Sequence, residues 1–137
     1  MTETTVKKKP EYRNINVTQI LRYRLPLAGK LSILHRISGA LLFLALPTVL
    51  LPIFDLSITS EYSFERMQAL VSSVWVKFIL LALIWSYLHH FCAGIRYLML
   101  DLHRGTEKYA AQKSAGIVFF VSLSLTALFA LKLFGVI

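Results

Sequence analysis

Long apolar stretches separated by short polar connections dominate this 137-residue chain. Three stretches, at about 32–53, 71–97 and 115–133, each hold about the 20 residues that a helix needs to cross a hydrocarbon core. The second pattern continues without a proline to about residue 102, so that helix is long enough to protrude from the membrane. The pattern therefore predicts an all-α membrane protein with three transmembrane helices in an up-down bundle, at about 32–53, 71–102 and 115–133.

The segment before the first apolar stretch has a different character. Residues 1–31 contain Pro10, Pro26 and Gly29 and no long apolar period, which is typical of a cytoplasmic arm followed by an interfacial segment. The predicted organisation is thus this N-terminal arm, 1–31, and a three-helix transmembrane anchor, 32–137.

Composition and charge support a membrane location and predict an orientation. The chain is 56% hydrophobic and 16% charged, which is too apolar for a soluble domain of this length. Its net charge of +8 is concentrated before the first helix and in the 96–113 connection, whereas the 54–70 connection is acidic. The positive-inside rule predicts a cytoplasmic N-terminus and a periplasmic C-terminus in a bacterial inner membrane. Lys7, Lys8 and Lys9 fit a topology signal that touches anionic membrane lipid, and we expect no nucleic-acid partner.

The second predicted helix carries ionisable residues, which are costly inside a membrane span and are by default functional. Helical spacing places His90, Gly94, Tyr97 and Asp101 on one face. A haem needs an axial imidazole and a nearby surface without a bulky side chain, and His90 with Gly94 supplies both. We expect Asp101 to pair with Arg96 at the helix end more readily than to relay protons to a quinone.

The opposite axial ligand of such a haem has no convincing source in this chain. His89 points about 100° away from His90 on the same helix, His103 lies at the aqueous boundary, and His35 belongs to another cluster. We therefore expect a second subunit to donate that ligand. His89 is expected to serve in packing or in a hydrogen bond.

A second polar cluster lies at the start of the first predicted helix. Ser32, Arg36 and Gly39 share one face, and His35 flanks it. Arg36 can bind a haem propionate or a quinone carbonyl, or it can simply be an interfacial anchor. Ser32 adds a hydroxyl one turn away, and together the two side chains suit the polar head of a quinone.

Both clusters carry a resemblance to a known family. One motif comprises Ser32, His35, Arg36, Ser38 and Gly39. About fifty residues later follows a second motif of His90, Gly94, Ile95, Arg96 and Asp101. In order and spacing, over about residues 22–130, the chain resembles the cytochrome b subunit of succinate dehydrogenase. One departure is Tyr97, where many members of that family have histidine.

The resemblance implies a specific set of roles. His90 would be the axial ligand of haem b, Ser32 and Arg36 would bind ubiquinone, and His35 with Arg36 would lie beside the haem propionates. Gly94 would allow close approach of the haem. The partners would be a second membrane-anchor subunit, which shares the haem, together with an iron–sulfur subunit and a flavoprotein subunit. Succinate itself would be oxidised elsewhere, because this chain has no site for it.

Three other functions are weighed against this one. A fumarate reductase anchor would use the same residues in the opposite direction, and a haem-free scaffold would need none of them. A transporter would need a polar path across the whole span, whereas the outer halves of the helices are almost purely apolar. The transporter hypothesis is therefore the weakest.

Overall fold

The computed structural model of the chain describes residue 16, residue 18 and residues 23–136. Lys7, Lys8 and Lys9, with most of the predicted arm 1–31, lie outside the described residues. From Leu27 onward the described chain is helical, without strands. Its elements are α2 (Leu27–Ala45), the π-helical turn η1 (Leu46–Leu50), α3 (Leu51–Ile58), α4 (Glu61–Ser72), α5 (Val74–Asp101) and α6 (Lys108–Leu133).

Three helical stretches of the described chain are long and apolar enough to cross a membrane. They are Leu27–Ile58, in which α2, η1 and α3 run on continuously, Val74–Asp101 and Lys108–Leu133. Their lengths of 32, 28 and 26 residues all exceed the roughly 20 residues that a span requires. The predicted all-α fold with three transmembrane helices is confirmed.

The first span begins at Leu27, five residues before the predicted start at Ser32. Pro26 is the N-cap in an extended conformation, and its carbonyl accepts hydrogen bonds from the backbone N–H groups of Gly29 and Lys30. Proline suits a helix start because its ring fixes φ and the missing N–H is not needed there. The polar residues that follow Pro26 thus belong to the first turns of the helix.

Two prolines in the first span coincide with a change in helix type. Pro47 lies inside η1, where the N–H of Leu51 bonds to the carbonyl of Leu46, five residues back. Pro52 follows at the start of α3, and the hydroxyl of Thr48 donates to the carbonyl of Leu44 at 2.7 Å. The wider turn accommodates the prolines without breaking the span.

The connection between the first two spans is more helical than the sequence pattern indicates. A short surface helix from Phe64 to Leu70 is expected there, whereas α4 runs from Glu61 to Ser72. Ser60 and Ser63 start it early, because each side chain accepts a hydrogen bond from the other residue's backbone N–H. Such reciprocal capping supplies partners for N–H groups that a helix start leaves unpaired.

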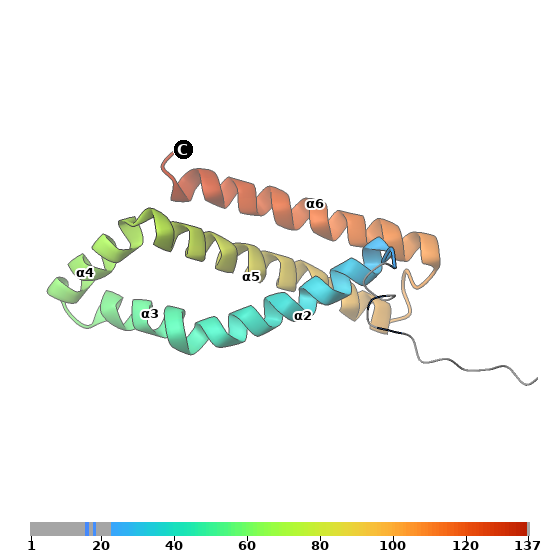
Figure 1. Cartoon of the computed structure of the whole chain (residues 1–137), viewed down its shortest axis with the longest axis horizontal. Coiled ribbons are helices and arrows are strands. Elements are labelled where there is room, and N and C mark those ends of the chain that lie inside the picture. Colours follow the sequence, from blue (N-terminus) through green and yellow to red (C-terminus); the bar gives the residue numbers. More distant parts are fainter. Residues whose placement is uncertain (1–15, 17, 19–22, 137) are drawn as a thin grey trace, which may run out of the picture.

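The spans pack with α5 between α2 and α6, and the beginning of α2 also reaches α6 (Figure 1). A hydrogen bond from the backbone N–H of Ala28 to Oε1 of Gln112 joins these two helices at 3.3 Å. Two of the four residues of the packed centre are alanines, and small side chains at helix interfaces let backbones in a membrane approach closely. The packed centre comprises Leu31, Ala93, Ala115 and Val118.

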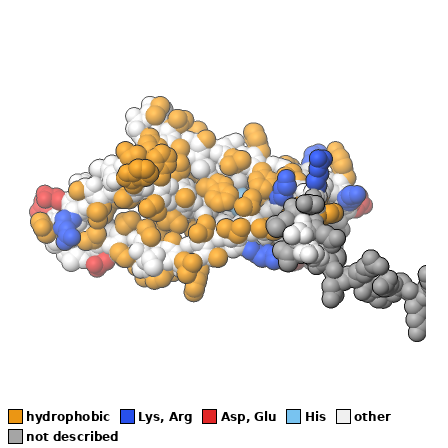
Figure 2. Space-filling model, in the orientation of Figure 1, with side chains coloured by type: hydrophobic (Ala, Val, Ile, Leu, Met, Phe, Trp, Pro, Cys, Tyr) orange, Lys and Arg blue, Asp and Glu red, His pale blue; other side chains and the backbone are white. Residues whose placement is uncertain are grey.

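The surface has the distribution expected of a membrane protein. Hydrophobic side chains cover the middle of the visible face, and charged side chains gather at its two ends (Figure 2). The start of α2, the end of α5 and the start of α6 lie at one of these ends (Figure 1). Both predicted polar clusters lie in the half of the bundle nearer to that end.

Candidate functional site

His90 lies where α5 meets α2. Its Nδ1 atom is 3.0 Å from the backbone oxygen of His35 and 3.4 Å from Oγ of Ser38. Its ring stacks on that of His35, with centroids 4.2 Å apart and planes inclined by 9°. The structure therefore brings together two histidines that the sequence places in different clusters.

The hydrogen bonds of His90 determine which nitrogen is available. A carbonyl oxygen only accepts, so Nδ1 of His90 carries the hydrogen and donates it to His35. In a neutral imidazole this leaves the lone pair on Nε2. Nε2 has no hydrogen-bond partner among the described residues, and it is not one of the enclosed polar atoms. His90 thus presents the tautomer and the free nitrogen that a metal ligand needs.

Gly39 makes room for the ring of His90. A Cβ atom on Gly39 would lie 2.8 Å from Cε1 of that ring, closer than real side chains approach, and a tight 3.1 Å from Nδ1. Gly94, one turn along α5 from His90, has more space, because a Cβ there would meet only Nε2 of His35, at 3.9 Å. Close approach of a haem at Gly94 stays a prediction.

Sequence reasoning assigns no role toward His90 to two of these residues, Ser38 and Gly39. Ser38 is fully buried, and its hydroxyl donates to the same His35 carbonyl at 2.9 Å. The available signal was spacing, since positions three and four after His35 share its side of the helix. That signal indicates a shared face but does not reveal which neighbouring helix lies against it.

Ser32 and Arg36 form a pair of their own on α2. Nη2 of Arg36 donates to Oγ of Ser32 at 3.2 Å, and Nε donates to the backbone oxygen of Ser32 at 3.3 Å. Because Ser32 accepts in this pair, its own hydroxyl hydrogen is free to donate to a ligand. Arg36 is exposed and Ser32 is partly exposed. The predicted quinone-binding pair is thus assembled on an accessible face, one residue along from His35.

Tyr97 lies against the other side of His35. The two ring centroids are 5.0 Å apart, and the guanidinium carbon of Arg96 lies 5.4 Å from the Tyr97 ring centroid. The hydroxyl of Tyr97 is buried without a hydrogen-bond partner among the described residues. A polar atom enclosed in this way marks the position as one where a further group outside this chain would be stabilising.

Arg96 does not form the expected helix-end pair with Asp101. It is only 7% exposed, and it donates from Nε to Oγ of Ser114 at 2.9 Å and from Nη2 to the carbonyl of Ala111 at 3.0 Å. The prediction was wrong because Arg96 faces α6, whose first turns offer it two acceptors. Asp101 is exposed at the end of α5.

The other histidines of α5 and its exit are not placed as ligands. His89 is fully buried between Trp85 and Phe119, with ring centroids at 5.2 and 5.4 Å. This agrees with the expectation that His89 serves in packing. His103 is exposed in the turn after α5, with φ of 56°.

The metal-ligating side chains near His90 suit a cofactor whose metal is already held largely by the cofactor itself. No group of three or more His, Cys, Asp or Glu side chains able to hold a metal ion occurs in the described part of the chain. A single anchored imidazole is too few for a bare ion, which takes four or more ligands, but it is what a haem takes from one side. The residues present therefore fit a haem.

Comparison with known proteins gives a consistent result. Residues 9–129 match the family described as "Succinate dehydrogenase/Fumarate reductase transmembrane subunit". The chain is 32% identical over 110 residues to a protein of Coxiella burnetii, covering 80% of this chain and 87% of that protein. It is 29% identical over 125 residues to one of Rickettsia prowazekii (91% and 97%) and 34% identical over 113 residues to one of Paracoccus denitrificans (78% and 85%). All three relatives are named succinate dehydrogenase cytochrome b556 subunit.

Proposed function

This chain belongs to the family of succinate dehydrogenase/fumarate reductase transmembrane subunits, and from that premise we propose that it is the haem b-containing membrane anchor of a succinate dehydrogenase. The family and the three apolar helices make it a multi-pass protein of a bacterial inner membrane. Its proposed task is to hold the soluble subunits at the membrane and to help form the site where ubiquinone is reduced.

His90 is the proposed axial ligand, and one observation carries this assignment. Nδ1 of His90 donates to the His35 carbonyl at 3.0 Å, and Nε2 is left unpaired and accessible. A ligating histidine typically donates its second ring N–H to such an acceptor, which fixes the tautomer and the ring orientation. The name cytochrome b556 of the relatives supports the choice of haem b.

The neighbouring residues have proposed roles around the same group. When bound, haem b supplies a centre that accepts and gives up single electrons. His35 and Arg36 would hold its propionates, since Arg36 is an exposed cation and His35 keeps both ring nitrogens free of hydrogen bonds within the described chain. Gly94 would leave space beside it.

Ser32 and Arg36 are the proposed quinone-binding residues. The hydroxyl of Ser32 keeps its hydrogen for a quinone carbonyl, while the hydrogen bond from Nη2 of Arg36 holds that hydroxyl in place. Donors aimed at a carbonyl oxygen stabilise the negative charge that develops there on reduction. The polar head would sit at the margin of the apolar belt, with its tail in lipid.

The same end of the bundle is proposed to face the cytoplasm, since basic residues outnumber acidic ones there. The iron–sulfur and flavoprotein subunits would bind at that end. A second membrane-anchor subunit would supply the opposite axial ligand, because His89 is enclosed and His103 lies in the exit turn.

Two alternatives use the same fold. An anchor of a fumarate reductase would run the reaction from quinol to fumarate, and the direction depends on the quinone and the soluble subunits. A haem-free scaffold would not need the accessible Nε2 of His90. The fit of a single anchored imidazole to a haem favours the first proposal over the scaffold.

A reduced-minus-oxidised spectrum of the purified complex tests the ligand assignment. We expect His90→Ala to abolish or strongly perturb the b-type absorption, because it removes an accessible imidazole nitrogen whose ring is fixed by a hydrogen bond to the His35 carbonyl. His89→Phe is the matched control and should keep the spectrum. An assembled His90→Ala complex with an unaltered haem spectrum would exclude His90 as the ligand.

Paired activity assays test the quinone site. We expect Ser32→Ala and Arg36→Leu to lower ubiquinone reduction about tenfold or more, since a hydrogen bond to a charged or developing charged group contributes about 1.5–3 kcal/mol. Succinate oxidation with a soluble dye should persist. Lys30→Leu, which removes an exposed cation from the same helix, should affect neither. Equal loss of both activities in the Ser32 and Arg36 variants would point to failed assembly, whereas unchanged ubiquinone reduction in the assembled variants would contradict the proposed role.

A further inference from the structure

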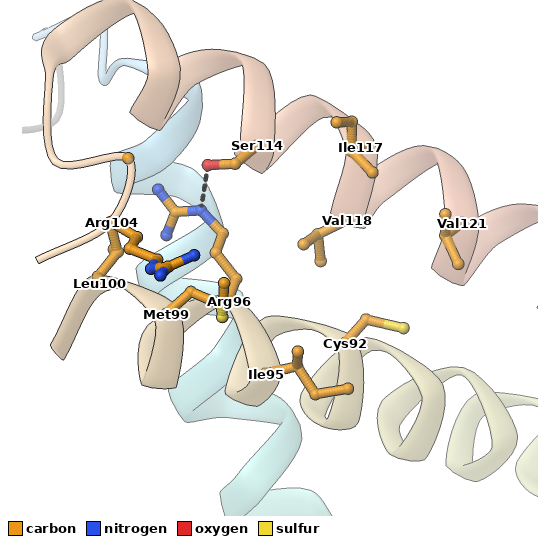
Figure 3. A pocket seen from close by; sticks show the side chains of 11 residues that line it. Cys92, Ile95, Arg96, Met99, Leu100, Arg104, Ser114, Ile117, Val118 and Val121 are labelled. Atoms are coloured by element: carbon orange, nitrogen blue, oxygen red, sulfur yellow. Dashed lines mark hydrogen bonds between the residues drawn. The ribbon is translucent and has the colours of Figure 1, made fainter. Parts of the chain in front are cut away.

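A groove separate from the His90 site runs between α5 and α6. It has a volume of about 490 Å³, and Figure 3 shows side chains of both helices lining it. His90 faces α2, so the groove lies on the other side of α5. Its apolar lining comprises Cys92, Ile95, Met99, Ile117, Val118 and Val121.

Two arginines close one end of this groove. Arg96 and Arg104 both belong to its lining, and Figure 3 shows the side chain of Arg104 turned toward that of Arg96. Arg96 uses Nε and Nη2 for its bonds to α6, which leaves Nη1 without a partner within the described chain. The guanidinium of Arg104 has no hydrogen bond or ion pair to any described residue. Both guanidinium groups thus belong to the lining of one groove, and neither is paired with a carboxylate of the described chain.

We propose that this groove binds an anionic phospholipid, with an acyl chain against the apolar lining and the phosphate between Arg96 and Arg104. Guanidinium groups recognise phosphate through paired N–H donors, and a phosphate that contacts both arginines would offset the repulsion between the two cations. The arginine end of the groove lies where α5 ends and α6 begins, at one end of the bundle (Figure 1), and lipid phosphates lie at such a boundary of the apolar spans.

The combination of an apolar lining with two arginines at one end favours a lipid over other occupants of the groove. A free phosphate would use the two arginines and leave the apolar groove empty. A helix of another protein would fill the groove but would have to bring a carboxylate to the same depth. An anionic phospholipid satisfies both ends of the groove, and it is present wherever the protein is.

Native mass spectrometry of the intact complex provides the first test. The detergent-purified complex is titrated with phosphatidylglycerol and with phosphatidylcholine of the same acyl chains. We expect phosphatidylglycerol to be retained preferentially, and Arg104→Gln to weaken its retention about fivefold, the effect of one basic residue near a lipid surface. Lys108→Gln is the matched control, since it removes an exposed cation at the same end outside the groove and should change nothing.

Filling the groove tests the acyl-chain half of the proposal. Ile117→Trp places a large ring in the groove and should lower phosphatidylglycerol retention as strongly as Arg104→Gln. Leu123→Trp adds the same ring to an exposed position of α6 outside the groove and should leave retention unchanged. A phosphatidylglycerol with a photoactivatable acyl chain should crosslink to residues 92–99 and 117–121.

Four results would overturn the proposal. The first is equal retention of phosphatidylglycerol and phosphatidylcholine, and the second is equal behaviour of Arg104→Gln and Lys108→Gln. The third is a pair of observations: millimolar inorganic phosphate displaces the lipid, and Ile117→Trp does not lower its retention. That pair would indicate a site for a small anion. The fourth is crosslinking of the photoactivatable phosphatidylglycerol that is confined to surfaces other than residues 92–99 and 117–121.

Discussion

His89 and His90 are neighbours in sequence and differ in almost every physical respect. His90 faces α2, donates from one nitrogen to a backbone carbonyl and keeps the other accessible. His89 faces α6, is fully buried between aromatic rings, and neither of its nitrogens has a hydrogen-bond partner among the described residues. A rotation of about 100° on the same helix separates the two environments.

This contrast shows that residue type alone does not make a ligand. To coordinate a metal, a histidine needs a ring nitrogen with an available lone pair that the metal can reach. It also needs a hydrogen-bond partner on the other nitrogen that fixes the ring. The interface with α2 offers all of these, because Gly39 leaves space for the ring and His35 offers its carbonyl. Around His89, the interface with α6 offers only aromatic contact and no hydrogen-bond partner among the described residues.

The largest effect is expected from closing the space beside His90. In Gly39→Ala the new Cβ would overlap the ring at 2.8 Å, so the ring must move and its bond to His35 is lost. We expect most of the haem to be lost from the purified complex, measured by its absorption per complex. Gly116→Ala on α6 is the control, because its Cβ would meet Leu27 at an ordinary 3.7 Å. Equal haem content in both variants would refute the role of Gly39.

A smaller but still large effect, on the stability of the complex, is expected from a substitution at the interface between α5 and α6. Arg96→Met removes two hydrogen bonds that join α5 to α6, one of them to a backbone carbonyl. We expect a loss of roughly 2–3 kcal/mol of stability, seen as a lower midpoint of thermal dissociation of the complex. Lys113→Met, an exposed cation of α6, should have almost no effect. Haem lost from the assembled Arg96 variant would show that the two interfaces are not independent.

A modest effect is expected from Ser38. Its hydroxyl lies 3.4 Å from Nδ1 of His90 and shares the His35 carbonyl with it. Ser38→Ala should keep the haem and shift its reduction potential slightly, measured by a redox titration, because the acceptor of the ligand N–H becomes stronger. Ser86→Ala is matched, since that serine is also fully buried and bonds only within its own helix. If Ser86→Ala shifted the haem reduction potential equally, the shift in Ser38→Ala could not be attributed to the His35 carbonyl.

The smallest effect is expected at His89. His89→Phe replaces a buried ring with unpaired nitrogens by an apolar ring that also fits between Trp85 and Phe119. Removing polar atoms that lack partners is neutral or stabilising, so the dissociation midpoint should stay or rise by the equivalent of at most about 1 kcal/mol. A clear decrease would mean that a partner outside the described chain, such as a water molecule or another subunit, satisfies His89.

Much of the architecture follows from the sequence pattern. Long apolar runs specify the three spans, because only a helix can satisfy backbone polar groups in lipid. The residues at which helices begin and end are harder to predict from hydropathy. The structure starts α2 at Leu27, directly after Pro26, and extends α4 beyond the expected 64–70. Capping residues decide both, and their effect depends on local geometry that hydropathy does not encode.

The candidate site divides in the same way. Spacing alone places Ser32 with Arg36 and His90 with Gly94, since these pairs lie one turn apart on single helices, and the first pair is hydrogen-bonded as a turn allows. The partner of Arg96 was missed, because helical spacing suggested Asp101 within the same helix whereas the acceptors lie on α6.

The amino-acid sequence by itself determined the helical spans and the residue types available near one end of the bundle, because hydrophobic length and helical periodicity are local properties. Only the tertiary structure decided that His90 rests on the His35 carbonyl against Gly39 while His89 is enclosed. The physical reason is that accessibility and hydrogen bonding across an interface depend on which helix packs against each face, and no single helix carries that information.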